Sequence, residues 1–215
     1  PEKVRFLQAA GFTQVVLARE LSLNEIRRIA EATTVPLEVF VHGALCVSYS
    51  GQCYLSAALS GRSANRGECA QYCRLPYTMV DATGAKIVTH KHLLSLKDMN
   101  RSDQLEALLD AGVSSLKIEG RLKDVDYVKN ITAYYRKKLD AVLSRRPEYR
   151  RASAGRSTYT FEPVAEKSFN RGFTPFLLEG RTADITAFNT PKSLGEPVGT
   201  VKELSLIHIS EPTRR

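Results

Sequence analysis

The four cysteines of this 215-residue chain, Cys46, Cys53, Cys69 and Cys73, all fall within one short window. Their spacing is C-x6-C-x15-C-x3-C, and no cysteine lies outside it. Four thiolates are a complete ligand set for one metal centre. We therefore expect the chemistry of the chain to lie in this window, and the four sulfur atoms to converge.

Three kinds of site could use four thiols at this spacing. Disulfides suit small secreted domains, whereas this chain is larger and opens without an apolar signal segment. Structural zinc accepts four thiolates, but its sites usually carry close C-x2-C pairs, which are absent here. An iron–sulfur cluster is larger than a single ion and tolerates wider, loop-borne spacing. The spacing alone does not choose between zinc and an iron–sulfur cluster.

Three segments of the sequence are informative in residues other than the cysteines. Residues 38–56 read EVFVHGALCVSYSGQCYLS, residues 60–74 read SGRSANRGECAQYCR, and residues 112–127 read GVSSLKIEGRLKDVDY. They resemble the collagenase-like peptidase family of unassigned catalytic type, and the resemblance extends over about residues 14–203. Within that family they are most similar to the branch that makes 5-hydroxycytidine in 23S rRNA. Related branches hydroxylate tRNA uridine or take part in oxygen-independent ubiquinone synthesis.

The resemblance implies a function as well as a cofactor. It implies a 4Fe–4S cluster on the four cysteines and oxygen-independent hydroxylation of a 23S rRNA cytidine, with prephenate as the co-substrate that supplies the hydroxyl. The partner would be 23S rRNA or its precursor, not DNA or a membrane, and the location would be cytoplasmic. The alternatives are hydroxylation of tRNA uridine, a collagenase-like peptidase, and a non-catalytic, metal-stapled module that binds RNA. The sequence has neither H-E-x-x-H nor G-x-S-x-G, so no protease machinery is recognisable.

Apolar runs typical of strands alternate with helical periodicity along the first two thirds of the chain. Ser22 and Glu25 form a capping-box pattern, and Gly112 suits a helix end. This alternation predicts an α/β fold of parallel βαβ units. The expected strands are 14–18, 37–41 and 113–118, with a further short strand considered at 93–95, and the expected helices are 2–10, 22–32, 102–111 and 124–144.

The resemblance also implies a (β/α)8 TIM-like barrel, which takes about 250 residues. We interpret residues 1–146 as the C-terminal part of such a barrel, carrying the cysteine cluster. Residues 147–156 would be a basic linker, and residues 157–203 the start of a small, truncated β-rich domain with a strand at 157–161. Residues 204–215 resemble the translation of a sequencing adaptor. On this interpretation the chain is a truncated fragment, and we expect the fragment by itself to be inactive.

Polar residues at strand ends are the candidates for chemistry, because barrel enzymes react at that edge. His42, just before the first cysteine, could donate a proton, orient substrate, or fix the turn by bonding a backbone carbonyl. The arginines could hold carboxylates or phosphates with their guanidinium forks. The alternatives are ion pairs at the barrel rim and a soluble loop. The candidate catalytic residues are His42, Glu119 and Arg121, and the candidate substrate-binding residues are Arg19, Glu20, Arg62, Arg66 and Lys117.

The chain is basic, with a formal net charge of +8. Residues 135–156 hold eight of the basic side chains and only two acidic ones. Such a concentration of positive charge suits a nucleic-acid backbone. The alternative is a solvated helix face followed by a soluble linker.

Overall fold

The computed structural model describes residues 1–197, 199 and 200, and its central element is strand β2 (Leu37–Gly43). β2 pairs in parallel with β1 (Val15–Val16) at its start and with β6 (Ser115–Ile118) along the opposite edge. The last residues of β2 pair in antiparallel with β5 (Asp98–Asn100). β5 in turn pairs in parallel with β7 (Phe173–Thr174), which completes a five-stranded sheet.

The helices begin at the capping residues that the sequence predicts. α2 (Leu23–Ala30) starts at Ser22, whose backbone N–H donates to the Glu25 carboxylate at 2.8 Å in a complete capping box. α5 (Val125–Arg145) starts at Asp124, whose carboxylate accepts a hydrogen bond from the third residue of the helix. The predicted α/β alternation and the parallel pairing of its strands are therefore confirmed.

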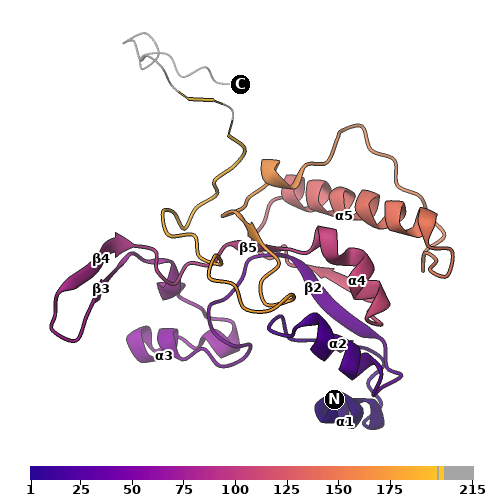
Figure 1. The fold of residues 1–215 in the computed structure, drawn as a ribbon, viewed down its shortest axis with the longest axis horizontal. Helices are drawn as coiled ribbons and strands as arrows, with labels where there is room; N and C mark the ends of the chain where they lie inside the picture. The colour runs from indigo at the N-terminus through magenta and orange to yellow at the C-terminus, as the bar shows by residue number, and fades with distance from the viewer. Residues whose placement is uncertain (198, 201–215) are drawn as a thin grey trace.

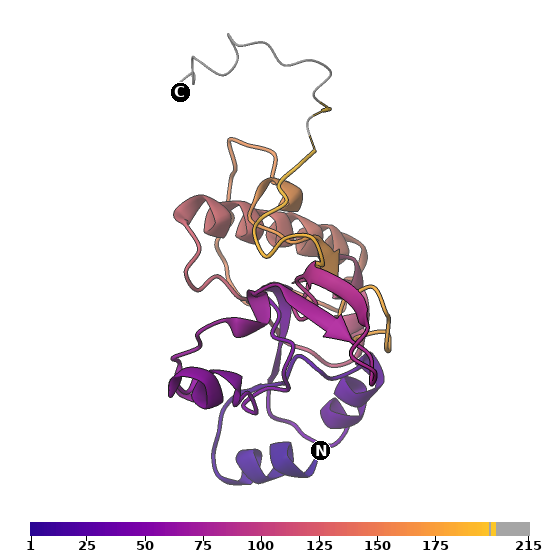
Figure 2. The same ribbon diagram turned by 90° about the vertical axis from the view of Figure 1, so that its left-hand side faces the viewer.

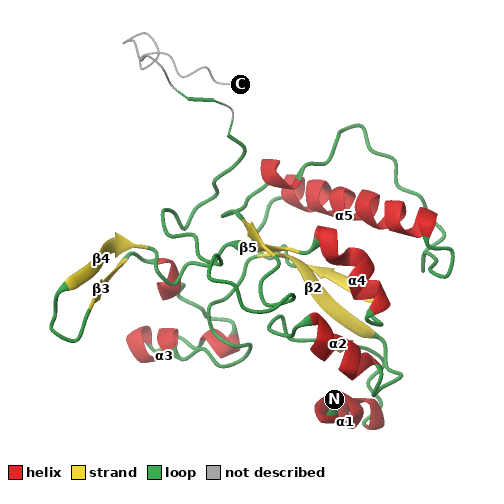
Figure 3. Ribbon diagram, in the orientation of Figure 1, coloured by secondary structure: helices red, strands yellow, loops and turns green. Residues whose placement is uncertain are grey.

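Most of the α-helices gather at one end of the molecule. Figure 1 shows α5, α4 (Leu105–Asp110) and α2 following one another alongside β2, with α1 (Glu2–Ala9) beyond α2. α3 (Leu55–Ser60) and the hairpin of β3 (Tyr77–Val80) and β4 (Lys86–Lys91) lie at the other end. Figure 2 views the molecule from that end, with α5 across the top and α1 at the bottom. Figure 3 shows that long loops connect many of these elements. The remaining short helices are the 3-10 turns Ala64–Arg66, Tyr72–Arg74, Ser102–Gln104 and Ala165–Lys167.

The main core lies between β2 and the helices. Val39 and Val41 of β2 pack with Ile26 of α2, Leu108 of α4 and Ile131 of α5, and all five side chains are almost fully buried. These residues lie on the apolar faces that the sequence periodicity indicates. None of the helices in the described part of the chain is both long and apolar enough to span a bilayer.

A buried ion pair joins the segment after α5 to the sheet. Asp98 of β5 accepts hydrogen bonds from the Arg171 backbone N–H at 2.8 Å and from its Nη1 at 2.9 Å, and both side chains are buried. Removing one partner of such a pair costs about 3–5 kcal/mol, since the other charge is left buried alone. The pair therefore fixes the chain immediately before β7 against β5.

Two strand predictions were wrong. Residues 93 and 94 form a turn closed by Ser95 N–H donating to His92 O at 3.0 Å, and the strand that pairs with β2 starts later, at Asp98. Residues 157–161 form no strand, because their alternating pattern has no partner strand among the described residues. Instead, β7 adds to the main sheet. The (β/α)8 barrel and the division at residue 147 stay predictions, and residues 204–215 lie outside the described residues.

Two glycines that follow helix ends offer a matched test of the packing between α2 and α4. Gly11 and Gly112 have φ of +88° and +89°, but only at Gly112 would a Cβ atom lie 2.6 Å from the Ala30 Cβ. We expect Gly11→Ala to cost about 1 kcal/mol for its left-handed backbone. Gly112→Ala should cost about 1–3 kcal/mol more, because it overpacks the helix contact. Urea unfolding measures both losses, and equal losses would contradict the expected crowding.

Candidate functional site

Three of the four cysteines lie on loops that follow β2 and surround α3, and Cys73 lies in the 3-10 turn Tyr72–Arg74. Cys69 is exposed and the other three are half-buried. Burial raises the pKa of Cys73, and the charges of Cys46, Cys69 and Cys53 raise it further. The convergence of the four sulfur atoms on one point stays a prediction.

The guanidinium group of Arg74 connects the first and last cysteines of the motif. Its Nη2 donates to Leu45 O at 2.6 Å and its Nη1 donates to Leu96 O at 3.0 Å. Because Leu45 precedes Cys46 and Arg74 follows Cys73, the bond to Leu45 places the two cysteine-bearing segments together. The positive charge also opposes the effect of burial on the pKa of Cys73. Nothing in the motif marks Arg74 except its place directly after a cysteine.

The two middle cysteines are held by their own local contacts. The backbone N–H of Cys53 donates to Asn65 Oδ1 at 3.1 Å. Ser56 Oγ, on α3, accepts from Ala70 N–H at 3.0 Å, next to Cys69. The sulfur of Cys69 itself accepts the backbone N–H of residue 71 at 3.4 Å. In iron–sulfur proteins, hydrogen bonds to the sulfur atoms help to set the reduction potential of the cluster.

These thiols fit a metal centre in number and donor type. Zinc and iron–sulfur clusters both take four thiolates. In residues 1–197, 199 and 200, however, no three His, Cys, Asp or Glu side chains are arranged around one point as ligands. The metal, and its identity, therefore stay predictions.

Arg19 and Glu20 position the loop between the first two cysteines. Arg19 donates from Nη2 to Ser48 O at 2.7 Å and from Nη1 to Ser50 Oγ at 3.1 Å. The Glu20 carboxylate accepts the Ser50 backbone N–H at 2.6 Å and lies 3.6 Å from Arg19. The ion pair at the strand end thus forms between these two neighbours, and both side chains fix the loop.

His42 lies in the core of the molecule. Its ring is surrounded by the rings of Tyr127, Tyr135 and Phe173, with centroids 5.4 to 6.1 Å away. Burial lowers the pKa of His42 to about 4, so the imidazole is neutral at pH 7. Its Nδ1 lies 3.3 Å from the Tyr135 hydroxyl, not against a backbone carbonyl, and its Nε2 has no partner among the described residues.

Three of the predicted residues line one small cavity of about 80 Å³, namely Arg19, His42 and Glu119. The ends of β2 and β6 meet there, where Glu119 N–H donates to His42 O at 2.8 Å. A side chain at Gly43 would not fit, since its Cβ would lie 2.5 Å from Glu119 O. The other lining residues are Phe40, Ala44, Leu45 and Met99.

The other predicted residues lie outside this cavity. Lys117 Nζ is 3.4 Å from the Glu38 carboxylate on the neighbouring strand. Arg121 is exposed, and its backbone N–H donates to the Glu119 carboxylate at 2.6 Å. Arg62 and Arg66 are exposed on the loop between the second and third cysteines. Of the predicted catalytic and substrate-binding residues, the structure therefore places only Arg19, His42 and Glu119 around one cavity.

The sequence motifs do not mark Arg101, which is 1% exposed. Its guanidinium donates to three backbone carbonyls, those of Arg19, Phe40 and Pro175, each at 3.1 Å. Burial lowers its pKa to about 10, which leaves it charged at neutral pH. Arg101 follows β5, the strand that periodicity missed, and so its burial could not be foreseen.

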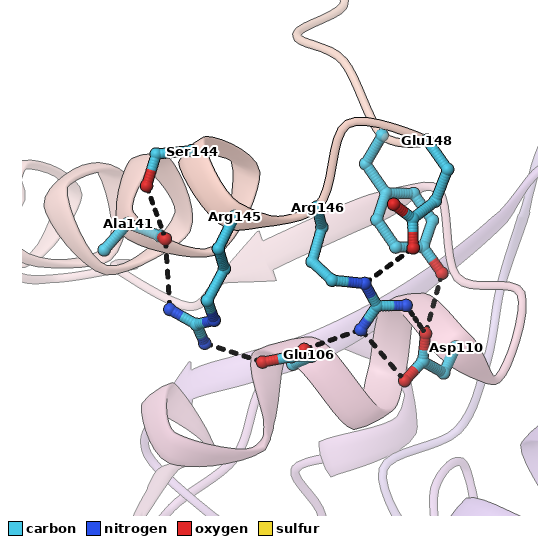
Figure 4. A network of polar contacts seen from close by, with 8 residues as sticks. Glu106, Asp110, Ala141, Ser144, Arg145, Arg146 and Glu148 are labelled. Atoms are coloured by element: carbon cyan, nitrogen blue, oxygen red, sulfur yellow. Dashed lines mark hydrogen bonds and ion pairs between the residues drawn. The ribbon is translucent and has the colours of Figure 1, made fainter.

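Most of the predicted basic patch is neutralised by ion pairs. Arg146 contacts the carboxylates of Glu106, Asp110 and Glu148, each at 2.6 Å, and Arg145 also pairs with Glu106 (Figure 4). These contacts fasten the end of α5 to α4. The paired members of the patch are Arg136, Lys137, Lys138, Arg145, Arg146 and Arg151.

Fold and site together define an α/β protein with four thiols in the segment that follows one strand end. The sequence profile described as Peptidase family U32 matches residues 1–187, and the chain belongs to that family. It is 55% identical to the "23S rRNA 5-hydroxycytidine C2501 synthase" of Escherichia coli K12, over 97% of this chain and 32% of that protein. It is 40% identical to the "tRNA hydroxylation protein P1" of Bacillus subtilis 168, over 64% of this chain and 34% of the relative.

A further relative carries a different name. The chain is 37% identical to a "Collagenase" of Porphyromonas gingivalis W83, over 74% of this chain and 40% of that protein. The chain thus spans about a third of the length of the curated relatives it matches. No solved structure matches it.

The buried imidazole of His42 should make stability depend on pH. Its pKa is about 4 in the folded chain and about 6.5 in the unfolded chain. The unfolded chain binds this proton first, so the stabilisation is complete above pH 6.5 and is lost as the pH falls towards 4. We expect the free energy of unfolding to fall by about 3 kcal/mol more in the wild type than in His42→Gln over that range. The exposed His90→Gln is the control, and parallel pH profiles for wild type and His42→Gln would refute the assignment.

The ion pairs at the end of α5 should contribute to the stability of the protein. Arg146→Gln removes the cation shared by three carboxylates and leaves like charges close together, so the urea midpoint should fall. The exposed Arg150→Gln should leave the midpoint unchanged. Urea titration of both variants at low and high salt is the measurement. A stable Arg146→Gln protein would mean that these pairs do not hold α5 on α4.

Proposed function

We propose that this chain is part of an iron–sulfur enzyme that hydroxylates a 23S rRNA cytidine to 5-hydroxycytidine, without oxygen and with a hydroxyl derived from prephenate. The observation that carries the proposal is the 55% identity with the E. coli protein of that name, over nearly the whole chain. The complete set of four thiols and the Arg74 hydrogen bond between the segments of Cys46 and Cys73 support the cofactor. A 4Fe–4S cluster held by Cys46, Cys53, Cys69 and Cys73 would supply a redox or Lewis-acid centre. The RNA substrate agrees with a cytoplasmic location.

We propose in addition that β1, β2 and β6 belong to a (β/α)8 barrel completed by parts of the protein outside this chain. Their parallel pairing and the helices between them support this. In such barrels the active site lies at the carboxyl ends of the strands. That is the end of β2 from which the first cysteine loop leaves and at which the small cavity lies.

The exposed arginines are the proposed contacts for anionic groups. Arg62, Arg66 and Arg121 are exposed, and Arg121 Nη2 lies 3.5 Å from Gly67 O in the loop that precedes Cys69. Their guanidinium groups suit RNA phosphates or the carboxylates of prephenate. The ion-paired arginines at the end of α5 are weaker candidates, because their charges are already matched.

Hydroxylation of tRNA is the second candidate, because several relatives of the chain are named for it. A peptidase is less well supported, although some relatives are named collagenases. His42 is buried against Tyr135 and does not activate a serine or cysteine nucleophile.

Deleting the gene in the organism that encodes the chain should remove one oxygen, about 16 Da, from a single cytidine of 23S rRNA. Mass spectrometry of rRNA fragments is the measurement. A gene with Cys46→Ala should not restore the mass, because a cluster ligand is lost. The control is a gene with Ser60→Ala, at the end of α3 and outside the ligand set, which should restore it. An unchanged rRNA mass with an altered tRNA would favour the second candidate.

Metal analysis of the same full-length protein, purified without oxygen, separates the two metal hypotheses. We expect about four irons per chain for a cubane cluster. Stoichiometric zinc without iron would instead indicate a structural site.

A further inference from the structure

A large aromatic side chain is exposed beside the second cysteine. Tyr54 directly follows Cys53 and precedes the first residue of α3, and it is 68% exposed. Its ring stacks with no other ring in the described part of the chain. Single exposed apolar groups are common on protein surfaces, so the surroundings of Tyr54 must decide what the ring does.

A hydrogen bond joins the start of α3 to the loop that follows this helix. The backbone N–H of Cys53 donates to Asn65 Oδ1 at 3.1 Å, and Asn65 lies in the 3-10 turn Ala64–Arg66. Tyr54 is the next residue after Cys53, and Arg66 is the next residue after Asn65. The exposed ring and the exposed arginine therefore leave the backbone at neighbouring points of one surface.

The arginines of this region are exposed and have no acidic partner. Arg62 and Arg66 lie on the loop after α3, and Arg121 donates from Nη2 to a backbone carbonyl of the same loop at 3.5 Å. None of the three forms an ion pair within the described part of the chain. Residues 47–75 hold a single acidic side chain, Glu68. Positive charge that the protein leaves unmatched attracts an anion such as a phosphate.

We propose that these four side chains form a binding surface for an unpaired segment of RNA, in which a base stacks on the ring of Tyr54 and the arginines contact phosphates. Proteins bind single-stranded nucleic acids with aromatic rings beside a basic surface, because every base has a face that can stack. In an RNA duplex the bases stack on one another and the major groove is too narrow for side chains, so a duplex offers no base to the ring. The inference rests on the proposed function and adds that the RNA is recognised in single-stranded form beside Cys53.

Fluorescence anisotropy with the full-length protein, purified without oxygen, tests the stacking. The probes are an unstructured RNA oligonucleotide and an RNA duplex of the same length. Tyr54→Leu should weaken binding of the single strand by about five- to a hundredfold, because one base–ring stack is lost, and should leave binding of the duplex unchanged. Tyr54→Phe keeps the ring and should bind like the wild type. The control is Phe6→Leu, which removes a ring that is 72% exposed on α1 and should have no effect.

The salt dependence of the same binding separates stacking from charge. Arg66→Gln should reduce the slope of log affinity against log salt concentration by about 0.7, the value for one phosphate contact on a single strand. Tyr54→Leu should leave that slope unchanged, because the tyrosine releases no counterion.

Several results would overturn the inference. One is equal affinity of the wild type and Tyr54→Leu for the single strand, and another is an equal loss of affinity for the duplex. Unchanged RNA binding with a lower stability of Tyr54→Leu would show that the ring packs against another part of the protein, and would also overturn it. Binding of single strands that depends on Tyr54, in a protein whose gene deletion leaves 23S rRNA unchanged, would support the inference and refute only the proposed function.

Discussion

The buried guanidinium group of Arg101 is the interaction on which the arrangement of strand ends depends. A charged side chain in a protein interior is costly unless its hydrogen bonds are satisfied. Arg101 has no carboxylate partner among the described residues and is satisfied by three backbone carbonyls, which come from the turn after β1, from β2 and from the turn after β7. Each of these segments is thereby fixed relative to the others at the edge where the cavity lies. A lysine could not replace it, because a single ammonium group lacks the planar fork that reaches three directions.

A second consequence of this arrangement is that the residues at the strand ends have divided roles. Arg19 uses its two terminal nitrogens on the loop after the first cysteine and its backbone carbonyl on Arg101. Glu20 is likewise occupied with the loop. Both side chains therefore position this loop, and substitutions at Arg19 will disturb it.

The sequence predicts those features of the fold that depend on residues close together in the chain. α2 and α5 could be predicted because their caps and apolar faces are local features. β5 and β7 have three and two residues, and only pairing with distant strands makes them strands, so their propensity carries no signal. The cysteines could be identified by type and spacing alone. The contacts of Arg74, Arg101 and Tyr135 could not, because they join residues far apart in the chain. The paired state of the basic patch was hidden for the same reason, since its partners on α4 lie about 40 positions earlier.

The bonds of Arg74 also bear on how a metal centre would be assembled. The segments that carry Cys46 and Cys73 are joined by protein hydrogen bonds, whereas Cys53 and Cys69 lie on an excursion around α3 with an exposed end. For the proposed cluster, Cys46 and Cys73 are thus positioned by the polypeptide before the metal binds. Cys53 and Cys69 would reach their final positions only when the iron binds. Loss of the metal would then loosen the excursion and leave the sheet intact, so the protein could be reloaded without refolding. Damage and repair of the cofactor would be local events in an otherwise stable molecule.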